Sequence, residues 1–274
     1  MKLQNKVAAI FAANGAIARE VAIEMAKEGA FVYVSGRNLN EVKSLSDEIN
    51  ANVDFLSANS GQRAKTFQVD ATNENEIENF LQQIIDKEGK LDIVFNGIGI
   101  RAEEGGYGTP STTLPFETFM KPLETVLGSQ FLTARIGARF IQKTETKGTI
   151  LMLTASLSRL KAPFMSGITA ACAGIEGLTR VLASEFGMSG IKVTCINPTA
   201  MPDTRTIQET TAQNAKTMGI PAEMMAEQMP KSSLLKSTLS TMGTAKVAAF
   251  LVSDAGAALN SHIVDVDFGT ASVI

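Results

Sequence analysis

Short apolar runs alternate with stretches of helical periodicity along most of the chain. Residues 6–12 form an apolar run of strand length, and after residues 14–15 apolar side chains recur at helical spacing over residues 17–25. Gly29 is suited to end that helix, and residues 31–35 form a second short β-rich run. This order predicts a strand, a tight turn, a helix and a second strand.

The clearest helical pattern follows a third predicted strand, residues 65–69. Apolar residues recur there at positions i, i+3, i+4, i+7 and i+8 behind a capping pair, Asn73 and Glu76. Further strands are predicted at residues 91–95, 149–153, 191–196 and 263–266, and further helices around 117–142, 167–187 and 244–253. Strands therefore alternate with helices to the end of the chain.

Strands that are apolar on both faces and separated by helices predict a parallel sheet covered on both sides. We therefore predict an α/β protein with a doubly wound, seven-stranded parallel sheet, in a single domain over residues 1–274. In such sheets ligands bind beyond the carboxyl ends of the strands. The predicted site is formed by the turns after Phe11, Val34, Val69, Phe95, Leu153 and Ile196.

Composition and charge narrow the range of partners. Hydrophobic residues make up 45% of the chain and charged residues 19%, as in ordinary globular proteins. The net charge of −3 is spread without a basic block, so we expect neither nucleic acid nor a membrane as partner. The apolar run at residues 7–13 is too short to span a bilayer, and a cytoplasmic location is expected. Cys172 and Cys195 lack metal-ligand spacing, so no metal site is predicted.

Several motifs occur in a fixed order between Lys6 and Gly269. They are an alanine-rich turn at residues 12–18, a strand and turn at 91–99, a long helix and strand at 175–193 that lead to Pro198 and Thr199, and the segments 250–254 and 266–269. In this order they resemble the short-chain dehydrogenase/reductase family. The resemblance implies a Rossmann fold, a nicotinamide cofactor and an oxidoreductase activity.

The three glycines of the family's cofactor turn fall on Ala12, Ala16 and Ala18. The backbone bends tightly and approaches the pyrophosphate there, and an alanine costs on the order of 1 kcal/mol where φ is positive. Gly15, one place early, is available to restore the turn, and Asn14 is available to ribose or phosphate. We expect weak cofactor binding; a helix start that binds nothing is the alternative.

The end of the second predicted strand carries the signal for the type of cofactor. Arg37 is placed to clamp an adenosine 2′-phosphate, which favours NADP(H) over NAD(H); a solvated, helix-capping arginine is the alternative. Asp70 resembles the family's adenine-edge aspartate, although Asp70 or Thr72 would serve equally well as a helix cap. The resemblance assigns the cofactor site to Ala12, Asn14, Gly15, Ala16, Ile17, Ser35, Arg37, Asn38, Asp70, Ala71, Asn96, Gly97, Ile98, Thr154, Pro198, Thr199 and Met201.

The family performs catalysis with a Tyr-x-x-x-Lys pair, a serine after the fifth strand and an asparagine on the preceding helix. The resemblance places the tyrosine at Ile168 and the lysine at Cys172. It places the serine at Ala155, and the asparagine is best matched by Val126. A general acid contributes roughly 10²–10⁴-fold in rate, and this contribution lacks its usual source here.

Few polar residues are available as replacements. Tyr107, in a glycine-rich loop, and Ser156, next to the lost serine, are weak candidates. Arg159 and Lys161 follow in the same loop as Ser156, and an exposed loop residue is the preferred interpretation for these candidates. Cys172 has no histidine nearby in the sequence, so helix packing is favoured over a nucleophilic role.

A methionine-rich segment at about residues 201–242 corresponds to the part of the family fold that covers the substrate. Six of the twelve methionines lie between Met201 and Met242. Methionine packs adaptably, which favours an apolar small-molecule substrate, although methionines that pack the lid on its own core would look the same. Small residues over 168–174 allow close helix approach, and the resemblance implies a homodimer or homotetramer.

Three functions are compatible with these observations. The first is an NADP(H)-dependent oxidoreductase with atypical acid chemistry and an apolar substrate. The second is a non-redox enzyme that shapes an isomerisation, cyclisation or dehydration. The third is a catalytically silent binding or scaffold subunit, and fold alone does not choose among them.

Overall fold

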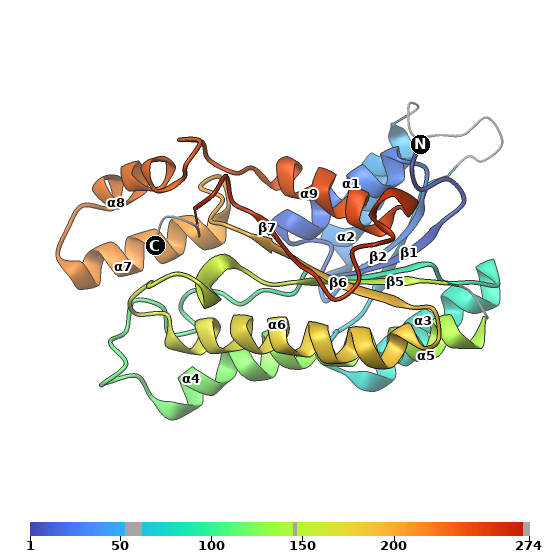
Figure 1. The fold of residues 1–274 in the computed structure, drawn as a ribbon, viewed down its shortest axis with the longest axis horizontal. Coiled ribbons are helices and arrows are strands. Elements are labelled where there is room, and N and C mark those ends of the chain that lie inside the picture. Colours follow the sequence, from blue (N-terminus) through green and yellow to red (C-terminus); the bar gives the residue numbers. More distant parts are fainter. Residues whose placement is uncertain (53–61, 145–146, 271–274) are drawn as a thin grey trace.

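The computed structural model of the protein describes residues 1–52, 62–144 and 147–270. Seven parallel strands form one sheet in the order β3-β2-β1-β4-β5-β6-β7, which confirms the predicted doubly wound sheet (Figure 1). The strands are β1 (Val7–Phe11), β2 (Phe31–Gly36), β3 (Ala64–Gln68), β4 (Ile93–Asn96), β5 (Thr149–Leu153), β6 (Lys192–Pro198) and β7 (Ile263–Val266).

Helices cover both faces of the sheet. They are α1 (Ala16–Lys27), α2 (Leu39–Ala51), α3 (Glu74–Glu88), α4 (Phe116–Pro122), α5 (Gly128–Lys143), α6 (Ser166–Gly187), α7 (Arg205–Met218), α8 (Ala222–Gln228) and α9 (Thr241–Val252). Helices α1, α2 and α9 pack on one face, and α3, α5 and α6 pack on the other (Figure 1). Each face of the sheet packs against its helices in a separate hydrophobic core, and the side chains of β1 alternate between the two. Ala8 and Ile10 belong to one core, and Ala9 and Phe11 belong to the other.

Two of the predicted strands, residues 149–153 and 263–266, have the observed bounds, and the others differ by one or two residues. The strand predicted at 191–196 continues to Pro198 because Asn197 and Pro198 pair with β7. The strand predicted at 91–95 begins later, since Asp92 precedes it and its carboxylate accepts a hydrogen bond from the Val7 amide at 2.9 Å.

Two local predictions were wrong in detail. The helix predicted over 117–142 is interrupted by a π-helical turn at Leu123–Leu127, directly after Pro122, whose missing N–H disturbs regular pairing. Neither Asp70 nor Thr72 caps α3. Asn73 is the cap and accepts from the amides of Asn75 and Glu76, while Asp70 accepts from Thr72 within the preceding turn.

Helices α7 and α8 lie beyond one end of the sheet, next to the carboxyl ends of the strands (Figure 1). Both fall in the methionine-rich segment singled out in the sequence. Among the residues described, no helix has the length and apolar character needed to cross a membrane. The space between α7, α8 and the strand ends holds the candidate site.

Candidate active site

A cavity of about 410 Å³ opens at the carboxyl ends of the strands, where the sequence placed the site. Its wall is built from the turns after β1, β4, β5 and β6, together with α6, α7 and α8. Within the described residues, its lining contains no aspartate, glutamate, lysine, arginine or histidine. The cavity is therefore uncharged, and its surface is mostly apolar.

The β1–α1 turn keeps the shape of a phosphate-binding turn although it is rich in alanine. Ala12 adopts a left-handed conformation with φ of 53°, the region in which glycine is favoured. Helix α1 begins after Gly15 with no side-chain cap and no acidic residue in its first turn. Gly15, Ala16 and Ile17 line the cavity, so the free N–H groups of this helix start are available to an anion. These residues fit the pyrophosphate of a dinucleotide.

Ala18 and Gly97 fit against each other beside this turn. A Cβ atom on Gly97 would lie 2.5 Å from the Cβ of Ala18, closer than two methyl groups can approach. The methyl group of Ala18 therefore occupies the room that a side chain at position 97 would need. The alanine that replaces a family glycine in α1 is accommodated by a glycine after β4.

The ends of β2 and β3 hold the groups expected around the adenosine. The Arg37 side chain is exposed and makes no hydrogen bond to the described residues. Asn38 caps α2, and both Asn14 and Asn38 donate to the Glu41 carboxylate, at 2.7 and 2.9 Å. Since Asn38 is the cap, the capping part of the alternative for Arg37 was wrong, while the exposed guanidinium agrees with a solvated side chain and is equally available to a ligand.

Other predicted cofactor residues have side chains that are occupied within the fold. The Ser35 hydroxyl donates to the Ile10 carbonyl at 3.2 Å. The Asn96 amide donates to Ser129 and Thr133, and its oxygen accepts from the Ile98 amide. These two side chains shape the turns. Nine of the predicted cofactor residues line the cavity, namely Gly15, Ala16, Ile17, Gly97, Ile98, Thr154, Pro198, Thr199 and Met201; Ala12, Asn14, Ser35, Arg37, Asn38, Asp70, Ala71 and Asn96 lie outside it.

The four positions that the resemblance assigns to catalysis come together in one wall. Val126, Ala155, Ile168 and Cys172 all line the cavity, as the predicted registration of the helix now observed as α6 requires. Three of them are hydrocarbon side chains, and burial raises the pKa of the Cys172 thiol above its ordinary value. Three hydrocarbon groups carry no proton to donate, and a thiol whose pKa is raised by burial is a weak acid.

Tyr107 is buried, with 6% of its surface exposed, so its interpretation as an exposed loop residue was wrong. The Gly108 amide donates to the Phe164 carbonyl at 3.1 Å, and the Thr217 hydroxyl donates to the Gly108 carbonyl at 2.5 Å. These bonds hold the loop so that the Tyr107 ring lines the cavity. Burial, with a further contribution from the nearby Cys172 thiol, raises the pKa of Tyr107 well above its ordinary value.

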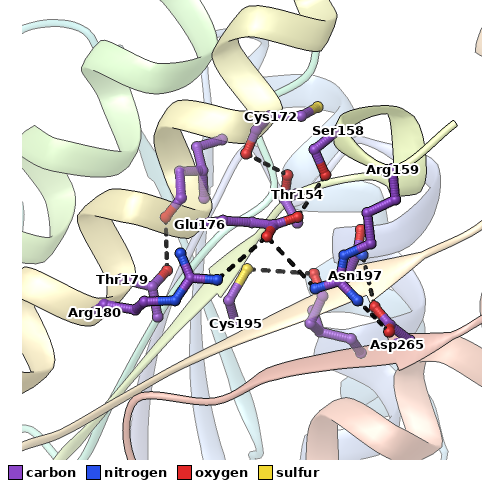
Figure 2. Close-up of polar contacts among 12 residues, drawn as sticks. Thr154, Ser158, Arg159, Cys172, Glu176, Thr179, Arg180, Cys195, Asn197 and Asp265 are labelled. Atoms are coloured by element: carbon purple, nitrogen blue, oxygen red, sulfur yellow. Dashed lines mark hydrogen bonds and ion pairs between the residues drawn. The ribbon is translucent and has the colours of Figure 1, made fainter. Parts of the chain in front are cut away.

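Ser156 is also buried, and the exposed-loop interpretation was wrong for it too. The residue lines the cavity, and its hydroxyl oxygen is fully buried with no hydrogen-bond partner among the described residues. The turn that it begins is tied down by Glu176 of α6, whose carboxylate accepts from Ser158 at 2.5 Å and contacts Arg159 at 3.4 Å (Figure 2). Arg159 also pairs with Asp265 of β7, so the turn is fixed to α6 and to the edge of the sheet.

Lys161, by contrast, is exposed as expected, and Arg159 is exposed although ion-paired. The sequence did not single out Asn214 of α7, which lines the cavity with 7% of its surface exposed. A polar residue on an amphipathic helix gives no sign that it faces a cavity. In residues 1–52, 62–144 and 147–270, no group of three or more histidines, cysteines or acidic residues is arranged to hold a metal.

Comparisons with known proteins agree with this geometry. The sequence model of the family described as enoyl-(acyl carrier protein) reductase matches residues 11–271. The chain belongs to the short-chain dehydrogenase/reductase family. The uncharacterised oxidoreductase YxbG of Bacillus subtilis is 29% identical over 98% of this chain and 92% of its own, and the D-beta-hydroxybutyrate dehydrogenase of Rhizobium meliloti is 27% identical over 96% and 98%.

Solved structures of this family share the fold. Sorbitol-6-phosphate 2-dehydrogenase from Erwinia amylovora superposes with a TM-score of 0.86 at 24% identity, over 96% of this chain and 98% of that one. The actinorhodin polyketide ketoreductase, solved with NADPH, superposes with a TM-score of 0.84 at 20% identity, over 97% of each chain. The protein is therefore an oxidoreductase-type member of this family.

Proposed function

We propose that the protein is an NADP(H)-dependent oxidoreductase that acts on an apolar small molecule and uses Tyr107 in place of the family's tyrosine. The observation that carries this proposal is the uncharged cavity, which adjoins the start of α1 and contains one tyrosine hydroxyl. The coarser assignment, an oxidoreductase of this family, rests on the comparisons.

The cofactor would be held mainly by backbone groups and by one cation. The amides at the start of α1 would bind the pyrophosphate, and Arg37 would bind the 2′-phosphate of NADP(H). The bound nicotinamide supplies or accepts a hydride. Neither contact requires the three glycines, because Ala12 already adopts the left-handed conformation and Ala18 is matched by Gly97.

Tyr107 is the best placed group to hold a proton for the substrate. Its ring lines the same cavity as Ile168 and Cys172, and its hydroxyl makes no hydrogen bond to the described residues. A phenol with a raised pKa stays protonated at neutral pH, and it can donate a hydrogen bond to an oxygen on which negative charge develops. Ser156, whose hydroxyl is likewise free within the described chain, is the second available donor.

A non-redox reaction is the alternative that the same cavity favours, because an uncharged wall can bind and shape a hydrocarbon skeleton without transferring hydride. Absorbance at the nicotinamide band separates the two. We expect NADPH, and NADH less well, to be oxidised in the presence of neutral aldehydes, ketones or enones with apolar bodies. If NADPH binds but none of these compounds oxidises it, the oxidoreductase proposal fails and the non-redox or silent role takes its place.

A further inference from the structure

The part of the cavity formed by α7 and α8 contains a buried amide without a protein partner. Asn214 lines the cavity, and its side-chain oxygen is fully buried with no hydrogen bond to the described residues. Its amide nitrogen makes none to them either. Buried amides in folded proteins are almost always hydrogen-bonded, because an unpaired one is a cost in free energy. The oxygen has no accessible surface, whereas the amide nitrogen is not among the fully buried unpaired atoms, so it is the nitrogen that is available to a ligand in the cavity.

Two of the threonine hydroxyls at and near the start of α7 are occupied by the backbone. Thr210 donates to the carbonyl of Thr206, one turn earlier in the helix, and Thr204 donates to the carbonyl of Met201. Both hydroxyls line the cavity but are occupied by the backbone. The amide of Asn214 is held by no such bond within the part of the chain that the structure describes, and neither are the hydroxyls of Thr206 and Thr211, which also line the cavity; of these three groups, Asn214 offers the amide.

Asn214 faces the same space as Tyr107. The residue before it, Gln213, lies against Gly108, and a Cβ atom on that glycine would be 3.0 Å from the Cβ of Gln213. Gly108 follows Tyr107 directly, and both Tyr107 and Asn214 line the cavity. The contact between α7 and the glycine-rich loop therefore brings the amide and the phenol to one region of the wall.

We propose that the cavity binds an uncharged, predominantly apolar molecule and that the Asn214 amide recognises a hydrogen-bonding substituent of it, a carbonyl or a hydroxyl. A carboxylate or phosphate would have to lose its water without meeting a cation, because the described lining contains none. The oxygen of a carbonyl or of a hydroxyl can accept from the amide nitrogen, so this one contact serves both members of an alcohol and ketone pair. The identity of this ligand as a substrate rests on the proposed function. The binding test below does not, because it requires no turnover.

The test is a binding measurement with three fluorescent probes of one shape. The first is the neutral naphthalene ketone prodan, the second is its analogue with a carboxylate in place of the propionyl group, and the third is the parent dimethylaminonaphthalene. Fluorescence titration is done on the full chain, with and without NADP+, and no turnover is needed. We expect prodan to bind at least about tenfold more tightly than the carboxylate, a ratio set by the cost of an unpaired buried charge.

The variant Asn214→Leu keeps the size of the side chain and removes the amide. We expect it to weaken prodan binding by about tenfold, to the affinity of the parent hydrocarbon, and to leave the parent unchanged. Its melting temperature should hold or rise, because an unpaired buried amide is replaced by an apolar group. Gln213→Leu is the matched control, since it removes the adjacent amide, which also has an unpaired buried oxygen but lies outside the cavity.

Three results would overturn the inference. They are equal binding of the carboxylate and the ketone, equal binding of prodan by wild type and Asn214→Leu, or no binding of any probe. Asn214-dependent binding of prodan by a protein that never oxidises NADPH would leave the inference standing and remove the proposed oxidoreductase function. NADPH oxidation by a protein whose prodan binding is unaffected by Asn214→Leu would support the proposed oxidoreductase function and overturn the inference about Asn214.

Discussion

The two sides of the cavity differ in how they depend on side chains. On the α1 side, alanines stand where the family has glycines, yet Ala12 adopts the required left-handed backbone and the start of α1 stays open. On the α6 side, Ile168 and Cys172 stand where the family has its tyrosine and lysine, so the pair that supplies the proton in the family is absent there.

The comparison teaches that the same kind of loss has different consequences on the two sides. Cofactor binding uses backbone N–H groups, which a methyl group crowds but does not remove. Proton transfer uses side-chain groups, and replacing them removes the chemistry. We therefore expect cofactor binding to persist on the α1 side. The hydrogen bond to the substrate oxygen would come from Tyr107, on a loop that belongs to neither side.

The largest expected effect follows from removing that hydroxyl. Tyr107→Phe should lower kcat by roughly 10²–10³-fold, the contribution of one hydrogen-bond donor to a developing oxyanion, while the affinity for NADPH stays within about twofold. Single-turnover NADPH oxidation with a neutral ketone measures the chemical step, and a cofactor titration measures the affinity. Tyr33→Phe is the control, because the Tyr33 hydroxyl donates to Glu88 at 2.6 Å, outside the cavity; equal rates for the two variants would exclude Tyr107 as the donor to the substrate.

The next largest effect concerns the cofactor side. Arg37→Ala should weaken NADPH binding by roughly 10- to 100-fold, because charge-assisted hydrogen bonds to the 2′-phosphate are lost, and should change NADH binding by less than about twofold. Calorimetric titration of both cofactors checks this. Lys43→Ala, which removes a cation from the exposed face of α2, controls for net charge; equal weakening of NADPH and NADH by Arg37→Ala would contradict a 2′-phosphate contact.

A smaller effect tests the fit between Ala18 and Gly97. Gly97→Ala should lower the free energy of unfolding by about 1–3 kcal/mol, because the new methyl group would overlap that of Ala18. The double variant with Ala18→Gly should recover most of the loss, since one methyl group again fills the space. Urea unfolding measures all three variants, and a loss that stays the same in the double variant would show that the two positions are not coupled.

The smallest effect is a change with pH. The pKa of Tyr107 is raised by burial and by Cys172, and the pKa of Tyr33 by burial and by Glu88. The unfolded chain loses these protons near pH 10, so the folded state binds more protons above that pH and its stability falls as pH rises. The chain has no tryptophan, which makes tyrosinate absorbance a clean measure.

While the circular dichroism stays native, neither tyrosine should ionise near pH 10. Both should ionise when the protein unfolds at higher pH. The same titration of Tyr33→Phe assigns any early step: a step near pH 10 in that folded variant would mean that Tyr107 is exposed. That result would remove the basis for its role in the cavity.

Hydrophobic periodicity was enough to predict the sheet, because strands buried on both faces and amphipathic helices differ in their repeat. The registration of α6 also predicted that Ile168 and Cys172 would share a wall. The burial of Tyr107 and Ser156 was not predictable in this way. It depends on bonds to Phe164, Thr217 and Glu176, which are distant in sequence from the loops that they fix, and single loops carry no periodic signal.

The central claim is that the α1 side still binds a dinucleotide although its glycines are alanines. Calorimetric titration of NADPH into the wild-type protein tests this most directly. The account predicts saturable binding of one NADPH per chain, tighter than that of NADH and unchanged in Tyr107→Phe. Heat of dilution alone for both cofactors, with the protein folded by circular dichroism, would contradict it.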